Sequence, residues 1–275
     1  MTVIVVGASS FIAKALQALP TTAHWSFLDG RAALTAGNHF EGVTCLINCA
    51  FNAELKNEPY DASRDIDLLL AQRLSDYPRA RYLMLSSRMV YGPSGADGRL
   101  HELLLPQPIN LYGKAKLQSE HALRHLLGER LTVLRLSNIC GYELQEGRRS
   151  FFAMASQSLV QHGRIVLDMS PFIERDFLPV ETLAHWLAQI TLKLQPGTFN
   201  LGAGNGVATG RIAQWLIEGF GSGELLINNL REHDAFWLDI EAAREAFAIP
   251  GVAPAELRAY CHALGQRLLH SKEAR

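Results

Sequence analysis

Short apolar runs alternate along this chain with longer segments in which leucine or alanine recurs every three to four positions. The short runs are rich in Val, Ile and Leu and predict strands, whereas the period of the longer segments predicts helices. Strands are expected at residues 3–7, 25–29, 44–49, 81–87, 131–137, 163–168 and 198–202. Helices are expected at residues 11–19, 61–76, 111–127, 180–193 and 209–220.

The expected strands are apolar throughout, which is typical of a parallel sheet covered by helices on both faces. Most of them precede a helix, so the pattern predicts a doubly wound, Rossmann-like α/β fold. After Leu136 the alternation is less even, because a polar, Arg-rich loop at residues 142–150 precedes a helix and Pro171 interrupts the next strand. This change predicts a smaller C-terminal lobe, whose tail from about residue 239 forms two helices separated by a turn at residues 250–254.

Composition and charge narrow the classes of partner. The 275 residues, 48% of them hydrophobic, can form one large α/β unit or two modest lobes. The net charge is −1 and the basic residues are scattered, so neither nucleic acid nor an anionic membrane is expected as a partner. The N-terminal strand has no basic flank or cleavage site, and no long apolar run follows, so we expect a cytoplasmic protein without a membrane span. The four cysteines lack metal-ligand spacing and are expected to be reduced core residues, with no metal site.

The N-terminal segment GASSFIA resembles a dinucleotide-binding turn. The strand Val3 to Val6 leads directly into Gly7 and a helix, but Ser10 and Ala13 stand where such turns usually carry two further glycines. Ser10 is small and its hydroxyl can donate to a phosphate, whereas the position of Ala13 needs only room for helix against strand. Asp29 ends the second expected strand and is placed to accept a hydrogen bond from an adenosine ribose. We therefore predict that this turn still binds a dinucleotide.

Two further segments carry candidate catalytic groups. In LYGKAK, Tyr112 and Lys116 are four residues apart in an expected helix, so both side chains lie on one face. A fixed ammonium lowers the pKa of a nearby phenol and makes tyrosine a usable acid and base near neutral pH. In LSSRMVYG, Ser86 and Ser87 end a strand at the carboxyl edge of the sheet, where open α/β sheets bind ligands.

These segments occur in a recognisable order. Through GASSFIA, LINCA, LSSRMVYG, HELLLPQP, LYGKAK, LRLSNICG, ERDFLPVETLA and FNLGAGNG, nearly the whole chain resembles the extended short-chain dehydrogenases of the NAD-dependent epimerase/dehydratase family, which modify nucleotide sugars. The resemblance implies that Tyr112 is the catalytic acid and base, that Lys116 tunes it and holds the nicotinamide ribose, and that Ser87 binds the reacting oxygen. Cofactor-binding positions are then Gly7, Ser10, Phe11, Ile12, Asp29 and Ala50, together with Tyr112 and Lys116. Substrate-binding positions are Ser87, Asn138 and Arg175.

Alternative roles exist for single positions of this set. Arg175 could instead form a salt bridge with Asp176 or Glu174, and Asn138 could cap a turn. Glu102 matches a family position, but we expect its role to be structural. The resemblance also implies a dinucleotide-binding domain at residues 1–145, with a return segment at about 175–200, and a substrate-binding lobe at 146–174 and 201–275.

A departure from the family pattern narrows the reaction. Related dehydratases carry an Asp-Glu pair directly after the catalytic Ser or Thr, whereas Arg88 and Met89 follow Ser87 here. We therefore expect a 4-epimerase or a 4-keto reductase acting on a nucleotide-linked hexose. The resemblance to the family implies a role in surface polysaccharide or glycan precursor synthesis. Asp29 favours NAD because a carboxylate repels a ribose 2′-phosphate, although Arg31 could pair with that phosphate and admit NADP.

Two expectations concern other roles of the chain. The altered glycine turn leaves open a non-catalytic protein that senses a dinucleotide or serves as a scaffold. The resemblance further implies a homodimer formed through the helices at residues 61–76 and 111–127.

Overall fold

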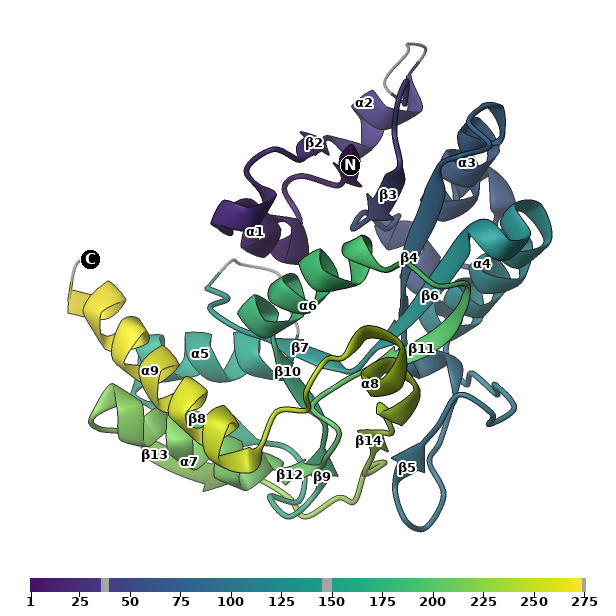
Figure 1. The fold of residues 1–275 in the computed structure, drawn as a ribbon. Coiled ribbons are helices and arrows are strands. Elements are labelled where there is room, and N and C mark those ends of the chain that lie inside the picture. The colour runs from purple at the N-terminus through teal and green to yellow at the C-terminus, as the bar shows by residue number, and fades with distance from the viewer. Residues whose placement is uncertain (36–39, 145–149, 274–275) are drawn as a thin grey trace.

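The computed structural model describes residues 1–35, 40–144 and 150–273 (Figure 1). Within them, six parallel strands form a central sheet in the order β11-β6-β4-β3-β1-β2. These strands are β1 (Val3–Val6), β2 (Ser26–Leu28), β3 (Cys45–Asn48), β4 (Arg81–Ser87), β6 (Leu131–Leu136) and β11 (Gly197–Leu201).

Helices cover both faces of this sheet because alternate strand residues point to opposite sides. In β1, Val3 and Val5 join the apolar core on one face, whereas Ile4 and Val6 join the core on the other. Helices α1 (Phe11–Gln17) and α6 (Val180–Leu192) pack together on the first face; α3 (Ile66–Arg73) and α4 (Leu111–Leu127) pack together on the second (Figure 1). The predicted doubly wound sheet is confirmed.

Two expected elements differ from the prediction. The expected helix at residues 61–76 is broken into η3 (Ala62–Arg64), α3 and η4 (Leu74–Asp76), because Asp65 is extended and caps α3. The expected strand at residues 163–168 forms β8 (Arg164–Leu167), which lies outside the central sheet and pairs with β13 (Glu224–Ile227). Alternate residues of β8 are exposed, as fits a small sheet with one solvated face.

The C-terminal part contains helices and short two-stranded sheets. Helices α7 and α9 lie side by side, and the predicted pair of helices in the tail is confirmed as α8 and α9 (Figure 1). The helices are α5 (Phe151–His162), α7 (Thr209–Phe220), α8 (Glu241–Phe247) and α9 (Pro254–Glu273). The short strand pairs are β5 (Arg99–Leu100) with β14 (Trp237–Leu238), β7 (Asn138–Cys140) with β10 (Phe177–Pro179), and β9 (Glu174–Arg175) with β12 (Val207–Ala208).

Several smaller features complete the description. The remaining short helices are α2 (Gly30–Leu34), η1 (Pro20–Thr22), η2 (Ala53–Lys56), η5 (Arg88–Val90) and η6 (Gly128–Arg130). The expected domain division at residue 145, and most of the Arg-rich loop, lie outside the described residues, so the two-lobe division stays a prediction.

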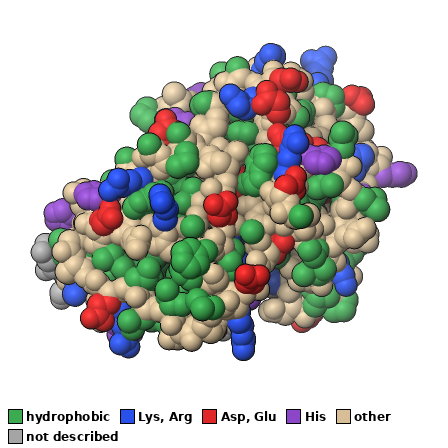
Figure 2. Space-filling model, turned by 90° about the horizontal axis from the view of Figure 1, so that it is seen from below, with side chains coloured by type: hydrophobic (Ala, Val, Ile, Leu, Met, Phe, Trp, Pro, Cys, Tyr) green, Lys and Arg blue, Asp and Glu red, His purple; other side chains and the backbone are tan. Residues whose placement is uncertain are grey.

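No described helix is long and apolar enough to span a membrane. Figure 2 shows acidic and basic side chains interspersed on one face of the molecule.

Candidate active site

The turn after β1 requires a glycine. Gly7 has φ +89°, and a Cβ atom there would lie 2.8 Å from the backbone nitrogen of Ala50 and 3.0 Å from its Cβ. Any larger residue would therefore combine an unfavourable backbone conformation with a clash against the loop after β3. The absence of a side chain at Gly7 thus allows the turn to contact the backbone of this loop.

Ser10 has a defined structural role. It is the N-cap of α1, and its hydroxyl oxygen accepts a hydrogen bond from the backbone N–H of Ala13 at 3.2 Å. Serine is among the best N-cap residues, whereas a glycine has no side chain that could accept a hydrogen bond from this N–H. The residue that replaces the second glycine therefore stabilises the helix whose N-terminus faces the turn. Ala13 is fully buried, as a position for close helix-to-strand packing requires.

A cavity of about 640 Å³ lies beside this turn. It is lined by Gly7, Ser9, Ser10, Asp29, Gly30, Arg31, Leu34, Cys49, Ala50, Phe51 and Ile66. The glycine turn, the open cavity and the carboxylate at the end of β2 fit the adenosine part of a dinucleotide. Burial raises the pKa of the Cys49 thiol to about 12, so this residue lines the cavity as an uncharged thiol.

The cofactor-binding residues expected from the sequence are divided between two places. Gly7, Ser10, Asp29 and Ala50 line the cavity, but Phe11 lines a neighbouring cavity and Ile12 packs against the core. The Asp29 side chain accepts a hydrogen bond from the backbone N–H of Arg31 at 2.8 Å and caps α2.

The first turns of α4 bring the predicted catalytic residues together. Asn110 caps this helix by accepting from the Gly113 N–H at 2.8 Å. The Tyr112 ring meets the Phe51 ring edge-to-face at 5.1 Å between centroids, and the Lys116 Nζ lies 4.9 Å from the Phe51 centroid. Phe51, which the sequence did not single out, therefore contacts both catalytic candidates and the cofactor cavity.

Lys116 is buried and is held by a carboxylate that sequence reasoning missed. Its Nζ lies 3.0 Å from Asp67 Oδ2 and donates to the Leu85 carbonyl at 3.0 Å. Asp67 Oδ1 in turn accepts from Asn48 Nδ2 at 2.8 Å and from the Tyr82 hydroxyl at 2.9 Å. Burial alone lowers the pKa of Lys116, but the Asp67 carboxylate, followed by Tyr112, outweighs this effect and raises it. Lys116 is therefore a permanent cation near the Tyr112 phenol.

Ser87 stands at the end of β4, as expected. Its oxygen accepts from the Met89 N–H at 3.2 Å and caps η5, so its hydroxyl proton can be donated to a substrate oxygen. The turn η5 packs against α4 at Gly113, where a Cβ atom would lie only 2.3 Å from the Met89 carbonyl oxygen. This close approach brings Ser87 and Tyr112 to the same edge of the sheet.

The two substrate-binding candidates lie on short strands beyond this edge. Asn138 begins β7 and Arg175 ends β9. No described residue forms an ion pair or hydrogen bond with the Arg175 guanidinium, so the alternative of a salt bridge to Asp176 or Glu174 is wrong. Asp176 instead accepts backbone hydrogen bonds from Ala203, Gly204 and Leu238. Its burial raises its pKa to about 6.

Glu102 accepts a hydrogen bond from the backbone N–H of Asn200 at 2.7 Å, at the end of the central sheet. This contact connects the loop before α4 to β11. It fits the structural role expected for this residue.

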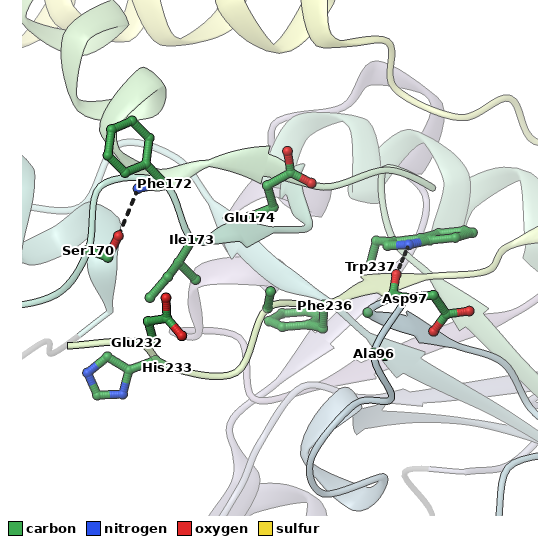
Figure 3. Close-up of a pocket in the computed structure, with 12 residues that line it drawn as sticks. Ala96, Asp97, Ser170, Phe172, Ile173, Glu174, Glu232, His233, Phe236 and Trp237 are labelled. Carbon is green, nitrogen blue, oxygen red and sulfur yellow. Dashed lines mark hydrogen bonds between the residues drawn. The ribbon is translucent and has the colours of Figure 1, made fainter. Parts of the chain in front are cut away.

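A separate cavity of about 350 Å³ lies among the short strands (Figure 3). Its wall carries the carboxylates of Asp97, Glu174 and Glu232 and the rings of Phe172, Phe236 and Trp237. None of the predicted catalytic or substrate-binding residues lines it. Because successive strand residues point to opposite sides, Arg175 points away from the side that Glu174 faces.

The sequence profile of the NAD dependent epimerase/dehydratase family matches residues 3–202. The chain belongs to this family. The predictions of an extended short-chain dehydrogenase fold and of an enzyme dependent on a nicotinamide cofactor are thereby confirmed. No curated protein sequence matches this family member significantly.

Solved structures share the fold of this epimerase/dehydratase family member over its whole length. UDP-glucose 4-epimerase from Thermotoga maritima, solved with UDP-glucose, has a TM-score of 0.82 at 17% identity, covering 100% of both chains. RMD from Pseudomonas aeruginosa, complexed with NADPH, has a TM-score of 0.81 at 20% identity, covering 98% of this chain and 100% of its own. dTDP-glucose 4,6-dehydratase from Bacillus anthracis, in complex with NAD, has a TM-score of 0.80 at 15% identity, covering 99% and 97%.

Proposed function

We propose that this enzyme acts on a nucleotide-linked hexose as a 4-epimerase or a 4-keto reductase. The observation that supports the proposal is that Tyr112 and Lys116 both contact Phe51, a residue that lines the cofactor cavity. Tyr112 and Lys116 project from the first turns of α4, and Ser87 ends the neighbouring strand β4. These are the groups that a reversible proton transfer at a sugar oxygen requires.

The proposed mechanism assigns one task to each side chain. Tyr112 gives or takes the proton at the reacting sugar oxygen, and its hydroxyl makes no hydrogen bond to another described residue. Ser87 donates to the same oxygen, and Lys116, a buried cation, would hold the nicotinamide ribose. Gly7, Ser10, Asp29 and Ala50 would hold the remainder of the dinucleotide, which supplies and accepts the hydride when bound.

The residues after Ser87 favour epimerase or reductase chemistry over dehydration. Elimination of water needs an acid and a base beside the sugar, but Arg88 and Met89 occupy those positions. The Met89 carbonyl is moreover packed against Gly113 of α4. Neither Arg88 nor Met89 can supply the carboxyl group that an elimination of water requires.

The choice of cofactor follows from the end of β2. Asp29 and Arg31 are both exposed and line the same cavity. We propose NAD, because the Asp29 carboxylate would repel a ribose 2′-phosphate, with NADP as the alternative if Arg31 pairs with that phosphate. Dissociation constants for NAD and NADP distinguish the two.

The decisive experiment compares Tyr112→Phe with a matched control, Tyr77→Phe, on a panel of nucleotide sugars followed by NMR. Tyr77 is a partly buried tyrosine whose ring meets the Phe40 ring edge-to-face, and neither residue lines the cavity. We expect Tyr112→Phe to lose roughly 10²- to 10⁴-fold in turnover and the control to retain it. A Tyr112→Phe enzyme as active as the parent would refute the assignment.

A second measurement separates the two reactions. An epimerase keeps its cofactor between half-reactions, whereas a reductase must exchange it. We therefore propose to denature protein purified without added cofactor and to quantify the dinucleotide released per chain. Nearly one NAD per chain favours the epimerase, and an empty protein that binds added cofactor favours the reductase. The homodimer and the cytoplasmic location stay predictions; sedimentation at micromolar concentration tests the first.

A further inference from the structure

One phenylalanine ring borders both the cofactor cavity and the two groups on α4 that are proposed to act on the substrate. Phe51 lines the cavity that begins at Gly7, whereas neither Tyr112 nor Lys116 is among the residues that line it. The Tyr112 ring meets the Phe51 ring edge-to-face, and the Lys116 Nζ lies over the same ring, 4.9 Å from its centroid. A dinucleotide that extends from this cavity to Tyr112 and Lys116 therefore has to pass Phe51.

The Phe51 ring also takes the last open side of the Lys116 ammonium. A lysine has three N–H donors, and this one pairs with Asp67 Oδ2 and the Leu85 carbonyl oxygen, each at 3.0 Å. The Phe51 ring is a third partner, because the face of an aromatic ring attracts a cation within about 6 Å of its centroid. A ribose hydroxyl that accepts a hydrogen bond from Lys116 needs the one N–H that remains. The ring and the ribose therefore compete for the same side of the ammonium.

Hydrogen bonds hold the backbone on both sides of Phe51. The Asn48 side chain accepts from the Ala50 N–H at 2.9 Å and donates to the Ala50 carbonyl at 3.1 Å. The Asn52 side chain accepts from the Glu54 N–H at 3.0 Å and caps η2. Phe51 itself is only partly buried, and such a side chain can change rotamer without a change in the backbone. The part of this segment that can move is therefore the ring.

We propose that Phe51 is a gate for the nicotinamide half of the dinucleotide: its ring covers Lys116 and turns aside when the nicotinamide ribose binds there. The inference rests on the proposed function, which assigns this ribose to Lys116. The hydrogen bond to the ammonium then forms only if the cation–π contact is lost, so the gate lowers the affinity for the whole dinucleotide. The adenosine half, which Gly7 and Asp29 would hold, is bound without this cost.

Calorimetric titrations with NAD and with ADP test the gate, on protein from which any co-purified dinucleotide has been dialysed. ADP has the adenosine and the diphosphate but no nicotinamide ribose. We expect Phe51→Ala to bind NAD roughly 2- to 30-fold more tightly than the parent, as the loss of one competing cation–π contact provides, and to bind ADP as the parent does. Phe51→Leu keeps an apolar side chain but has no aromatic face, so its NAD affinity should lie between those of the parent and Phe51→Ala.

Phe199→Ala is a matched control. Phe199 is also partly buried, and its ring meets the Phe247 ring edge-to-face at 4.8 Å, but it lies on β11 and does not line the cavity. This variant should leave both affinities unchanged. A thermal scan checks that each variant is folded, and if Phe51→Ala is not, the NAD affinity of Phe51→Leu decides.

Three results overturn the inference and leave the proposed function standing. Unchanged NAD affinity in Phe51→Ala would show that the ring does not compete with the ribose. Weaker NAD binding with unchanged ADP binding would make the ring a platform on which the nicotinamide half rests. An equal gain for ADP would place the ring against the adenosine half. If the parent binds neither NAD nor ADP, the assigned cofactor cavity is wrong, and the proposed function and the inference fail together.

Discussion

The buried ion pair between Lys116 and Asp67 predicts that either single substitution is far more damaging than the double one. Lys116→Met leaves the Asp67 carboxylate in the core without its cation, and Asp67→Asn leaves the ammonium with only the Leu85 carbonyl. The two side chains are 5% and 2% exposed, so water cannot replace the missing partner. Removing one member of such a pair costs about 3–5 kcal/mol of unfolding free energy.

The double variant, Lys116→Met with Asp67→Asn, removes both charges. The amide oxygen that replaces the Asp67 carboxylate can still accept a hydrogen bond from Asn48 or Tyr82, so we expect this variant to lose less than either single one. The coupling free energy from the double-mutant cycle should then exceed about 2 kcal/mol. Because the Asp67 carboxylate raises the pKa of Lys116 above its ordinary value, the ammonium stays charged at neutral pH.

Urea unfolding followed by circular dichroism measures these free energies, and thermal scans provide a second readout. The single variants should melt roughly 6–20 °C below the parent, at about 2–4 °C per kcal/mol for a chain of this size. Arg64→Met is the control, because Arg64 forms exposed ion pairs with Glu58 and Asp61 and should lose less than about 1 kcal/mol. Additive single effects, or losses as small as the control's, would refute the reasoning.

Three further predictions concern the cofactor turn and the second buried acid. Gly7→Ala should abolish dinucleotide binding in calorimetry and lower stability, because its Cβ would lie 2.8 Å from the Ala50 nitrogen; unchanged affinity would contradict the assigned turn. Ser10→Ala should lower the free energy of unfolding by about 1 kcal/mol because α1 loses its N-cap, whereas Ser10→Gly should lower it by only a few tenths. The glycine variant should retain its affinity for the dinucleotide. A loss of binding in Ser10→Gly would instead make the hydroxyl a phosphate contact. Burial, and then the charge of Asp67, raises the pKa of Asp65, so the folded state favours its protonated form and loses stability as pH rises above the unfolded value. Asp65→Asn cannot ionise, so its stability relative to the parent should be greater at about pH 7 than at about pH 4; the opposite trend would show that Asp65 is stabilising as a carboxylate.

Features that depend only on residues close together in the sequence could be predicted from the sequence. The apolar runs identify the six strands of the central sheet, because a strand buried on both faces must be apolar along its length. The helical period places Tyr112 and Lys116 on one face of α4, and Gly7 marks the turn after β1. These properties are local and therefore visible in a short stretch of chain.

Only the tertiary structure decided which distant groups meet. Lys116 and Asp67 are 49 positions apart, and Arg88 and Asp234 are 146 apart. The charges within the apolar segment DIDLLL indicate buried acids that need partners, but no periodicity identifies those partners. The same holds for β8, whose apolar run looks like a central strand but pairs with β13. Strand pairing and buried charge pairing depend on how helices and sheets pack in three dimensions, and that packing brings together residues that local patterns cannot relate.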